Sequence, residues 1–234
     1  IIFVTAMSST EDEKRGLETG AVDYIPKPIS PPIVEARVRT HLALYDQSRE
    51  LERMVQQRTL ELLTTRQQII RRLGRAAEFK DNETGNHVLR MSHYARVIAI
   101  AHGLGDEAAD VILNTAPMHD IGKIGIPDSI LLQPGKLDAE EWAVMHQHPI
   151  MGAEIIGKHD NELLETARII ALTHHEKWDG SGYPQRLKGE EIPLEGRIVA
   201  IADVFDALVS ARPYKKAVPV NEALQYLEDQ VGRH

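Results

Sequence analysis

Short apolar and polar segments alternate along the first 40 positions of the chain. Residues 1–6 predict a buried parallel strand, and residues 21–25 predict a second, shorter one. Between them, residues 9–20 predict a helix that begins at a Ser or Thr N-cap and ends at Gly20. A further helix is expected from about Pro31. This order of elements predicts half of an open α/β sheet over residues 1–40.

The next segment, residues 41–73, is charged, lacks Gly and Pro, and favours a helix. Its apolar residues follow a seven-residue repeat, with some repeats divided into steps of four and three residues: Leu44, Leu51, Val55, Leu62 and Ile69. That spacing predicts the seam of a parallel coiled coil that joins two chains, although Ser48, Arg58 and Thr65 interrupt it. The alternative is a single amphipathic helix that lies on its own domain.

Helical periods dominate residues 74–234, where strand signals are few. Helices are expected at 87–103, 106–118, 139–157, 161–174 and 198–210. Gly and Pro cluster at 127–135 and 180–193, which predicts loops. We therefore expect a mainly α protein with three parts: an α/β segment (1–40), a helical linker (41–73) and an all-helical domain (74–234).

Composition narrows the class of protein. The 234 residues contain no Cys, which excludes disulfides, thiolate zinc sites and cysteine nucleophiles. No apolar run reaches the roughly 18 residues that span a bilayer, so we expect a cytoplasmic protein without membrane contact. The net charge of −8 argues against nucleic-acid binding. Both ends look cut, because the chain opens on a bare strand pattern and stops near a helical stretch.

The pair His119-Asp120 is the strongest chemical signal. It follows the apolar runs 111–113 and 116–118, so the pair is expected at a buried helix end. A buried ionised carboxylate is costly unless it is paired or bound to metal. Adjacent helical residues point about 100° apart, so both reach one ion only near a helix end, and Gly122 permits that break.

Further residues of ligand type interrupt the predicted helices. Glu83 and His87 are four apart and share a helix face, unless Asp81-Asn82 caps that helix instead. His148 is preferred over His146 as a ligand because Pro149 after it marks an irregular helix. The alternative for Glu83 and His87 is an ordinary i, i+4 pair on a solvated helix face, and periodicity alone would also allow His146 as the ligand.

Three more candidates lie downstream. His174-His175 ends an apolar stretch, where two neutral imidazoles are satisfied by metal or, alternatively, by backbone carbonyls. Asp203 interrupts an almost wholly apolar helix and needs a partner. Asp206, one turn later on the same face, is expected either to support a ligand or to contact substrate. Imidazoles and carboxylates together suit Fe, Mn, Zn or Ni and predict a multinuclear metal-dependent hydrolase.

The first 40 residues resemble the C-terminal half of a response-regulator receiver domain. The resemblance rests on Thr5, Asp23-Tyr24 and Lys27-Pro28. It implies that Thr5 and Lys27 contact a phosphoryl group and that Tyr24 belongs to the output switch. The strand with the phosphate-accepting Asp would belong to the other half, and a sensor histidine kinase is the implied partner.

The helical part resembles the HD-GYP family of bacterial cyclic di-GMP phosphodiesterases. The matching motifs are His119-Asp120-Ile121-Gly122-Lys123, His174-His175-Glu176, Asp179-Gly180-Ser181-Gly182-Tyr183-Pro184, Ile192-Pro193, Asp203 and Arg212-Pro213-Tyr214-Lys215. The resemblance implies metal ligands at His87, His119, Asp120, His148, His174, His175 and Asp203. Asp120 would bridge two irons or similar ions, and Glu83 would admit a third. The family's final helices are missing from the pattern.

The same resemblance assigns roles in the reaction. Lys123 and Asp120 are the expected catalytic residues, and Lys123 also contacts phosphate. Arg212 and Lys215 are expected to bind the remaining phosphate, while Gly182 and Tyr183 shape the pocket and meet a guanine. The implied reaction hydrolyses cyclic di-GMP to pGpG, GMP or both. The Gly-Tyr-Pro loop is also a candidate docking surface for diguanylate cyclases.

Two other functions fit the same residues. One is hydrolysis of another nucleotide, such as a hybrid cyclic dinucleotide. The other is a non-catalytic sensor that binds the ligand or a partner protein, which the full set of ligand residues disfavours.

Overall fold

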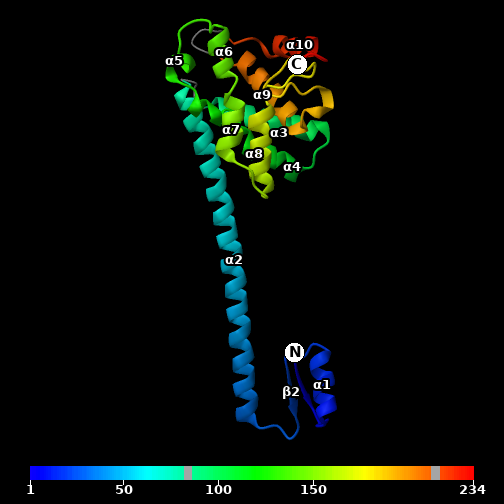
Figure 1. The fold of residues 1–234 in the computed structure, drawn as a ribbon. Coiled ribbons are helices and arrows are strands. Elements are labelled where there is room, and N and C mark those ends of the chain that lie inside the picture. Colours follow the sequence, from blue (N-terminus) through cyan, green and yellow to red (C-terminus); the bar gives the residue numbers. More distant parts are fainter. Residues whose placement is uncertain (82–85, 212–216) are drawn as a thin grey trace. The chain divides into compact units, whose positions relative to one another are not determined.

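The computed structural model describes residues 1–81, 86–211 and 217–234, most of them helical (Figure 1). The chain divides into two compact units, Ile1–Thr64 and Thr65–His234. One helix, α2 (Pro31–Lys80), runs through the boundary between them. The prediction of a mainly α fold is confirmed.

The first unit contains the small α/β segment. Strand β1 (Ile2–Thr5) pairs in parallel with β2 (Asp23–Pro26), and α1 (Thr10–Glu18) connects them. The Ser9 hydroxyl accepts the Asp12 amide at 3.1 Å and so caps α1, as expected. The predicted glycine C-cap is shifted by one residue, since Thr19 is the cap and Gly20 follows with φ +95°.

The first strand is parallel as predicted, but the prediction that it is buried is wrong, since none of residues 1–6 is buried. Phe3 and Val4 are 36% and 45% exposed, because only β2 pairs with β1 in the described sheet. Tyr24 is buried, and its hydroxyl donates to the Met7 carbonyl at 2.7 Å. Asp23 accepts Arg37 of α2 at 2.6 Å, which joins β2 to the first turns of the long helix.

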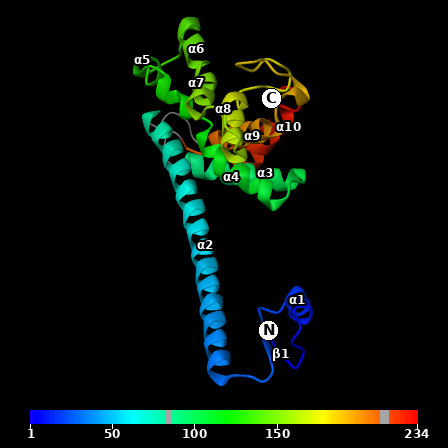
Figure 2. The same ribbon diagram turned by 60° about the horizontal axis from the view of Figure 1, so that its bottom comes forward.

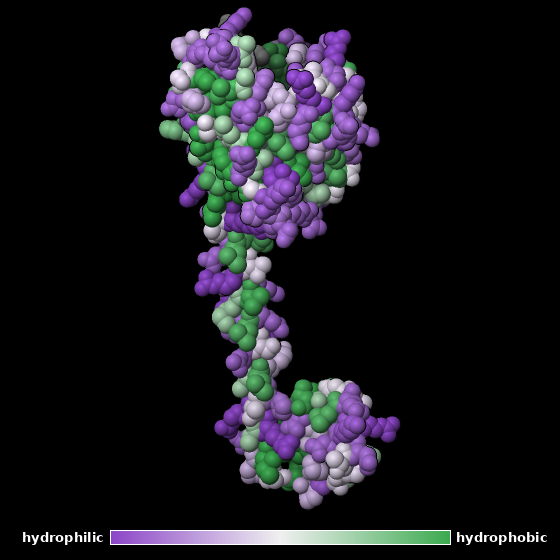
Figure 3. Space-filling model, viewed as in Figure 1, coloured by the Kyte–Doolittle hydropathy of each residue, from purple (hydrophilic) through white to green (hydrophobic). Residues whose placement is uncertain are grey.

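Helix α2 is continuous across the predicted linker boundaries at 41 and 73. Its seam positions are exposed: Leu44 55%, Leu51 51%, Val55 63%, Leu62 70% and Ile69 53%. Figure 3 shows apolar and polar residues mixed along this helix. No helix in the described ranges has the length and apolar content needed to cross a membrane.

The second unit is built on four packed helices. These are α3 (His87–His102), α4 (Asp106–Thr115), α8 (Glu162–Thr173) and α9 (Leu194–Val209). Figures 1 and 2 show α3, α8 and α9 gathered together, and α3 packs against both α4 and α9. Met91, Ile112, Ile170 and Val199 fill the core between them, each 2% exposed or less. This apolar packing fixes the helix ends from which the polar residues project.

Shorter elements complete the unit. They are the 3₁₀ turns η1 (Ala116–Met118), η2 (Ile121–Gly125) and η3 (Gly189–Glu191), with α5 (Asp128–Leu131), α6 (Ala139–Met145), α7 (His148–Ile156) and α10 (Val220–Asp229). The single helix predicted over 139–157 is wrong, because it breaks at His146 and Gln147 into α6 and α7. The helix predicted over 106–118 ends at Thr115, and the helix predicted from 198 begins at Leu194.

Candidate metal centre

Seven ligand-type residues form two groups in the second unit. Within each group the donor atoms lie within 4.8 Å of one another. The first group is Asp120, His148, His174 and His175, and the second is His87, His119 and Asp203. Helix ends supply most of them, since His87 and His148 open α3 and α7 and the double His follows α8. The helical core thus brings together residues far apart in sequence.

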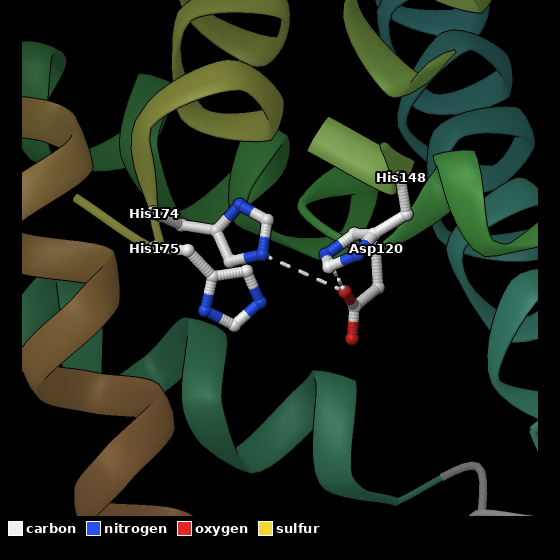
Figure 4. Close-up of side chains that lie close together, drawn as sticks. All are labelled: Asp120, His148, His174 and His175. Atoms are coloured by element: carbon white, nitrogen blue, oxygen red, sulfur yellow. Dashed lines mark ion pairs between the residues drawn. The ribbon is translucent and has the colours of Figure 1, made fainter. Parts of the chain in front are cut away.

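Asp120 connects the two groups. Its Oδ1 lies 3.3 Å from His148 Nε2 and 3.5 Å from His174 Nε2, as Figure 4 shows. Its Oδ2 lies 3.1 Å from His119 Nε2, which belongs to the second group. The two carboxylate oxygens therefore face different groups, which is the arrangement a bridging carboxylate needs.

Hydrogen bonds at Nδ1 orient four of the histidine rings. His119 Nδ1 donates to the Ala116 carbonyl at 3.0 Å, and His148 Nδ1 to the Met145 carbonyl at 2.8 Å. His174 Nδ1 bonds the Ile170 and Ala171 carbonyls, both at 3.1 Å, and His87 Nδ1 bonds Asp206 at 2.7 Å. A carbonyl only accepts, so Nδ1 carries the proton and a neutral ring presents its Nε2 lone pair.

Those lone pairs converge on buried space. The Nε2 atoms of His119, His148 and His174 and Oδ1 of Asp120 are buried without a hydrogen-bond partner. Leaving so many polar atoms unpaired costs roughly 1–3 kcal/mol each. Bound cations would satisfy all of them at once, and imidazole with carboxylate suits Fe, Mn, Ni or Zn rather than Ca or Mg. The residues therefore fit a divalent metal site.

The electrostatics of the site favour the ligand-competent forms of His174, His175 and Asp120. Burial lowers the pKa of His174, and lowers that of His175 well below the usual range. Burial opposes ionisation of Asp120, but Lys123 and His119 outweigh it and hold its pKa well below the ordinary value. The pKa of His119 is raised despite burial, because Asp120 and Asp203 attract positive charge to this point.

Lys123 lies against the bridging carboxylate. Its Nζ is 2.8 Å from Asp120 Oδ2 and 2.6 Å from Asp81 Oδ2. Burial opposes the charge on Lys123, but the two carboxylates raise its pKa, so the amine stays protonated. Asp81, which the sequence suggests only as a helix cap, instead holds this cation in place.

Asp206 is fully buried and contacts His87 of the second group. One oxygen accepts His87 Nδ1, and Arg90 donates to both oxygens at 2.7 and 2.9 Å. The buried Asp206 carboxylate has no exposed surface that a substrate could contact. Of its two predicted roles, substrate contact and support of a ligand, the geometry therefore favours support of His87.

The Gly-Tyr-Pro loop packs against the double His. A Cβ on Gly182 would lie 2.3 Å from the Lys177 amide nitrogen, so only glycine fits this approach. Glu176 is buried and accepts the amides of Gln185 and Leu187 at 2.7 and 3.0 Å. The Tyr183 amide donates to the His175 carbonyl at 3.2 Å. His146, the alternative ligand, lies outside both groups and stacks on Tyr183.

The last turns of α2 contact the segments that carry the site. A Cβ on Gly74 would lie 2.3 Å from the Pro117 carbonyl oxygen, which places α2 directly against η1. Glu78 accepts the Val88 amide at 2.8 Å and so caps α3. Lys80 donates to the Ile124 and Ile126 carbonyls, both at 2.7 Å. The end of α2 therefore holds three of the segments that position the metal ligands and Lys123.

Three predicted site residues, Glu83, Arg212 and Lys215, lie outside the described residues. Sequence reasoning gave no role to Arg90, treated Asp81 only as a possible helix cap, and noted Glu176 only as part of a motif. Each is a charged residue whose partner is distant in sequence or in a loop, so no local pattern indicates it.

A family model for the HD domain matches residues 51–234. The chain belongs to the HD domain family. A solved structure, Bd1817, an HDG"Y"P protein from Bdellovibrio bacteriovorus, is 26% identical with a TM-score of 0.50. That alignment covers 63% of this chain and 47% of Bd1817. The resemblance indicated by the motifs is thus confirmed.

Several curated relatives align over the whole chain. A probable cyclic di-GMP phosphodiesterase from Vibrio cholerae is 43% identical, and the cyclic di-GMP phosphodiesterase response regulator RpfG from Xanthomonas campestris is 45% identical. The chain spans 58% and 64% of their lengths. A 3′3′-cGAMP-specific phosphodiesterase 2 from Vibrio cholerae is 49% identical over 75% of this chain and 34% of its own length.

Proposed function

We propose that this chain hydrolyses the phosphodiester bonds of cyclic di-GMP at a centre of two or three metal ions. The observation that carries the proposal is the set of buried, unpaired Nε2 atoms that face Asp120. The names of relatives that align over the full chain support this substrate. Iron is the favoured metal, with Mn, Ni or Zn as alternatives.

Divalent ions at such a site lower the pKa of water and offset charge on phosphoryl oxygens. The chain's own residues prepare the site for them. Carbonyl acceptors hold Nε2 deprotonated on His119, His148 and His174, and Asp120 keeps the two groups together. Glu83 is the proposed additional ligand for a third ion.

Lys123 supplies a fixed cation beside Asp120. Because Asp81 and Asp120 keep it protonated, it is suited to bind a phosphoryl oxygen or to donate a proton to the leaving oxygen. Arg212 and Lys215 are proposed to hold the second phosphate, Arg212 as a fork and Lys215 as a point charge. The proposed products are pGpG, GMP or both.

A second candidate substrate is 3′3′-cGAMP. It is favoured by the 49% identity over 75% of this chain to a phosphodiesterase named for that nucleotide. Cyclic di-GMP remains the first choice because the relatives that also align with residues 1–40 are named for it.

Residues 1–40 support a proposal about regulation. By their resemblance to a receiver domain, we propose that a sensor histidine kinase regulates this protein by phosphorylation, and we place the protein in the cytoplasm. The exposed apolar seam of α2 supports a homodimer through a parallel coiled coil. Diguanylate cyclases are a further candidate partner at the Gly-Tyr-Pro loop.

The test is a turnover assay with protein loaded anaerobically with Fe(II) or Mn(II). Cyclic di-GMP and 3′3′-cGAMP are supplied in parallel, and products are separated by chromatography. We expect cyclic di-GMP to be hydrolysed with the larger kcat/KM. A larger kcat/KM for 3′3′-cGAMP would identify that nucleotide as the substrate instead. Binding of either nucleotide without turnover would identify a non-catalytic sensor.

A further inference from the structure

His175 differs from the other histidines of the metal centre. Four of them have a hydrogen bond at Nδ1, to a carbonyl or to Asp206. Among the contacts of the described residues, His175 has ring neighbours but no side-chain hydrogen bond. A ligating imidazole needs a neighbour that fixes its orientation. For His175 that neighbour must act through ring packing.

Tyr183 is the ring that covers His175. The two rings are stacked, with centroids 4.7 Å apart and planes inclined by 24°. Tyr183 also stacks on His146, at 3.9 Å and 23°. If His146 and His175 stacked on the same face of Tyr183, their rings would also contact each other. No such ring contact occurs between them in the described part of the chain. Tyr183 therefore lies between them.

Both sides of this stack are anchored. On one side, the Glu176 carboxylate and the Tyr183 amide tie the loop to the double His, and Gly182 allows the close approach. On the other side, His146 occupies the break between α6 and α7, two residues before the candidate ligand His148. Trp142 packs on His146 with ring centroids 5.4 Å apart.

We propose that Tyr183 and His146 are positioning residues that hold the His175 ring in its ligating orientation by stacking. The inference rests on the proposed metal centre and adds a role for the Gly-Tyr-Pro tyrosine within it. Because His146 and His175 cover both faces of Tyr183, a guanine has only its phenol edge to contact. His146 contributes a flat ring rather than a metal-binding nitrogen.

The test compares variants that keep a ring with variants that remove it. His146→Phe and Tyr183→Phe keep stacking surfaces, whereas His146→Ala and Tyr183→Leu do not. Metal-free proteins are titrated with Mn(II), with the free ion followed by its EPR signal, and with Fe(II) under anaerobic conditions. His159→Ala, which removes a histidine outside both groups, is the matched control. Circular dichroism of each metal-free variant checks that the helical content is unchanged.

We expect His146→Ala and Tyr183→Leu to weaken the binding of one ion by about 10–100-fold. The two Phe variants and the His159 control should bind all ions as the wild type does. If His146→Phe loses metal as fully as His146→Ala, a nitrogen of His146 is required and stacking is refuted. Wild-type affinity in every variant would also refute it. A wild-type protein that binds neither ion would overturn the metal centre itself.

Discussion

Gly122→Ala tests whether the close contact between η2 and α7 assembles the site. A Cβ at this position would lie 1.8 Å from the His148 carbonyl oxygen and 2.5 Å from the Gly152 amide nitrogen. Both are backbone atoms, so no side chain can move aside. The segments must separate by at least about 1 Å to restore ordinary packing distances. That movement would carry His148 away from Asp120. In the present structure His148 Nε2 lies 3.3 Å from Asp120 Oδ1.

The expected consequences are large for a single methyl group. Overpacking typically costs about 1–3 kcal/mol, and a displacement of about 1 Å in a site reduces rate by roughly 100-fold. Thermal unfolding, metal content and turnover of cyclic di-GMP measure the effects. Gly105→Ala is the control, because a Cβ there meets nothing within 4 Å. A Gly122→Ala protein with wild-type metal content and turnover would refute the importance of this contact.

Three further predictions concern separate parts of the molecule. Burial opposes ionisation of Asp206, but hydrogen bonds from His87 and Arg90 outweigh this effect and lower the pKa of the carboxyl group. The ionised Asp206 therefore stabilises the fold fully above about pH 4, the usual carboxyl pKa. This stabilisation is lost as the pH falls through the lower pKa of the folded state. Asp206→Asn should therefore lower the unfolding free energy of the metal-free protein by about 2 kcal/mol at pH 7 and progressively less below pH 4; a pH-independent difference in urea titrations would exclude this. Lys123→Ala should reduce kcat by about 100-fold with the metal content unchanged, and wild-type kinetics would remove Lys123 from the reaction. Leu62→Glu, at the seam of α2, should yield monomers in sedimentation, whereas Leu60→Glu, exposed but off the seam, should not; a monomeric wild type would contradict the coiled coil.

Local sequence pattern predicted the helices well where periodicity was uninterrupted. It failed where tertiary contacts decide the boundary. The linker was predicted to end at residue 73, but α2 continues through Gly74 to Lys80. The absence of a side chain at Gly74 lets this part of the helix pack closely against Pro117. Pro149, taken as an irregularity within one helix, belongs to the first turn of α7, where proline is favoured.

In the site, too, local pattern indicated some residues, whereas others depend on tertiary contacts. Burial of His119, His148 and His174 follows from the apolar runs around them, so they were predictable as candidates. The supporting residues were not, because Arg90 meets Asp206 across 116 positions and Asp81 meets Lys123 across 42. Such pairs depend on how α2, α3 and α9 pack, which periodicity does not specify.

We infer that separate helices hold a cluster of metal ions that acts on a cyclic dinucleotide. Elemental analysis of anaerobically prepared protein, with turnover of cyclic di-GMP measured on the same sample, tests it most directly. We expect two or three ions per chain and activity that disappears when a chelator removes them. Fewer than two ions in an active sample, or activity that survives their removal, would contradict it.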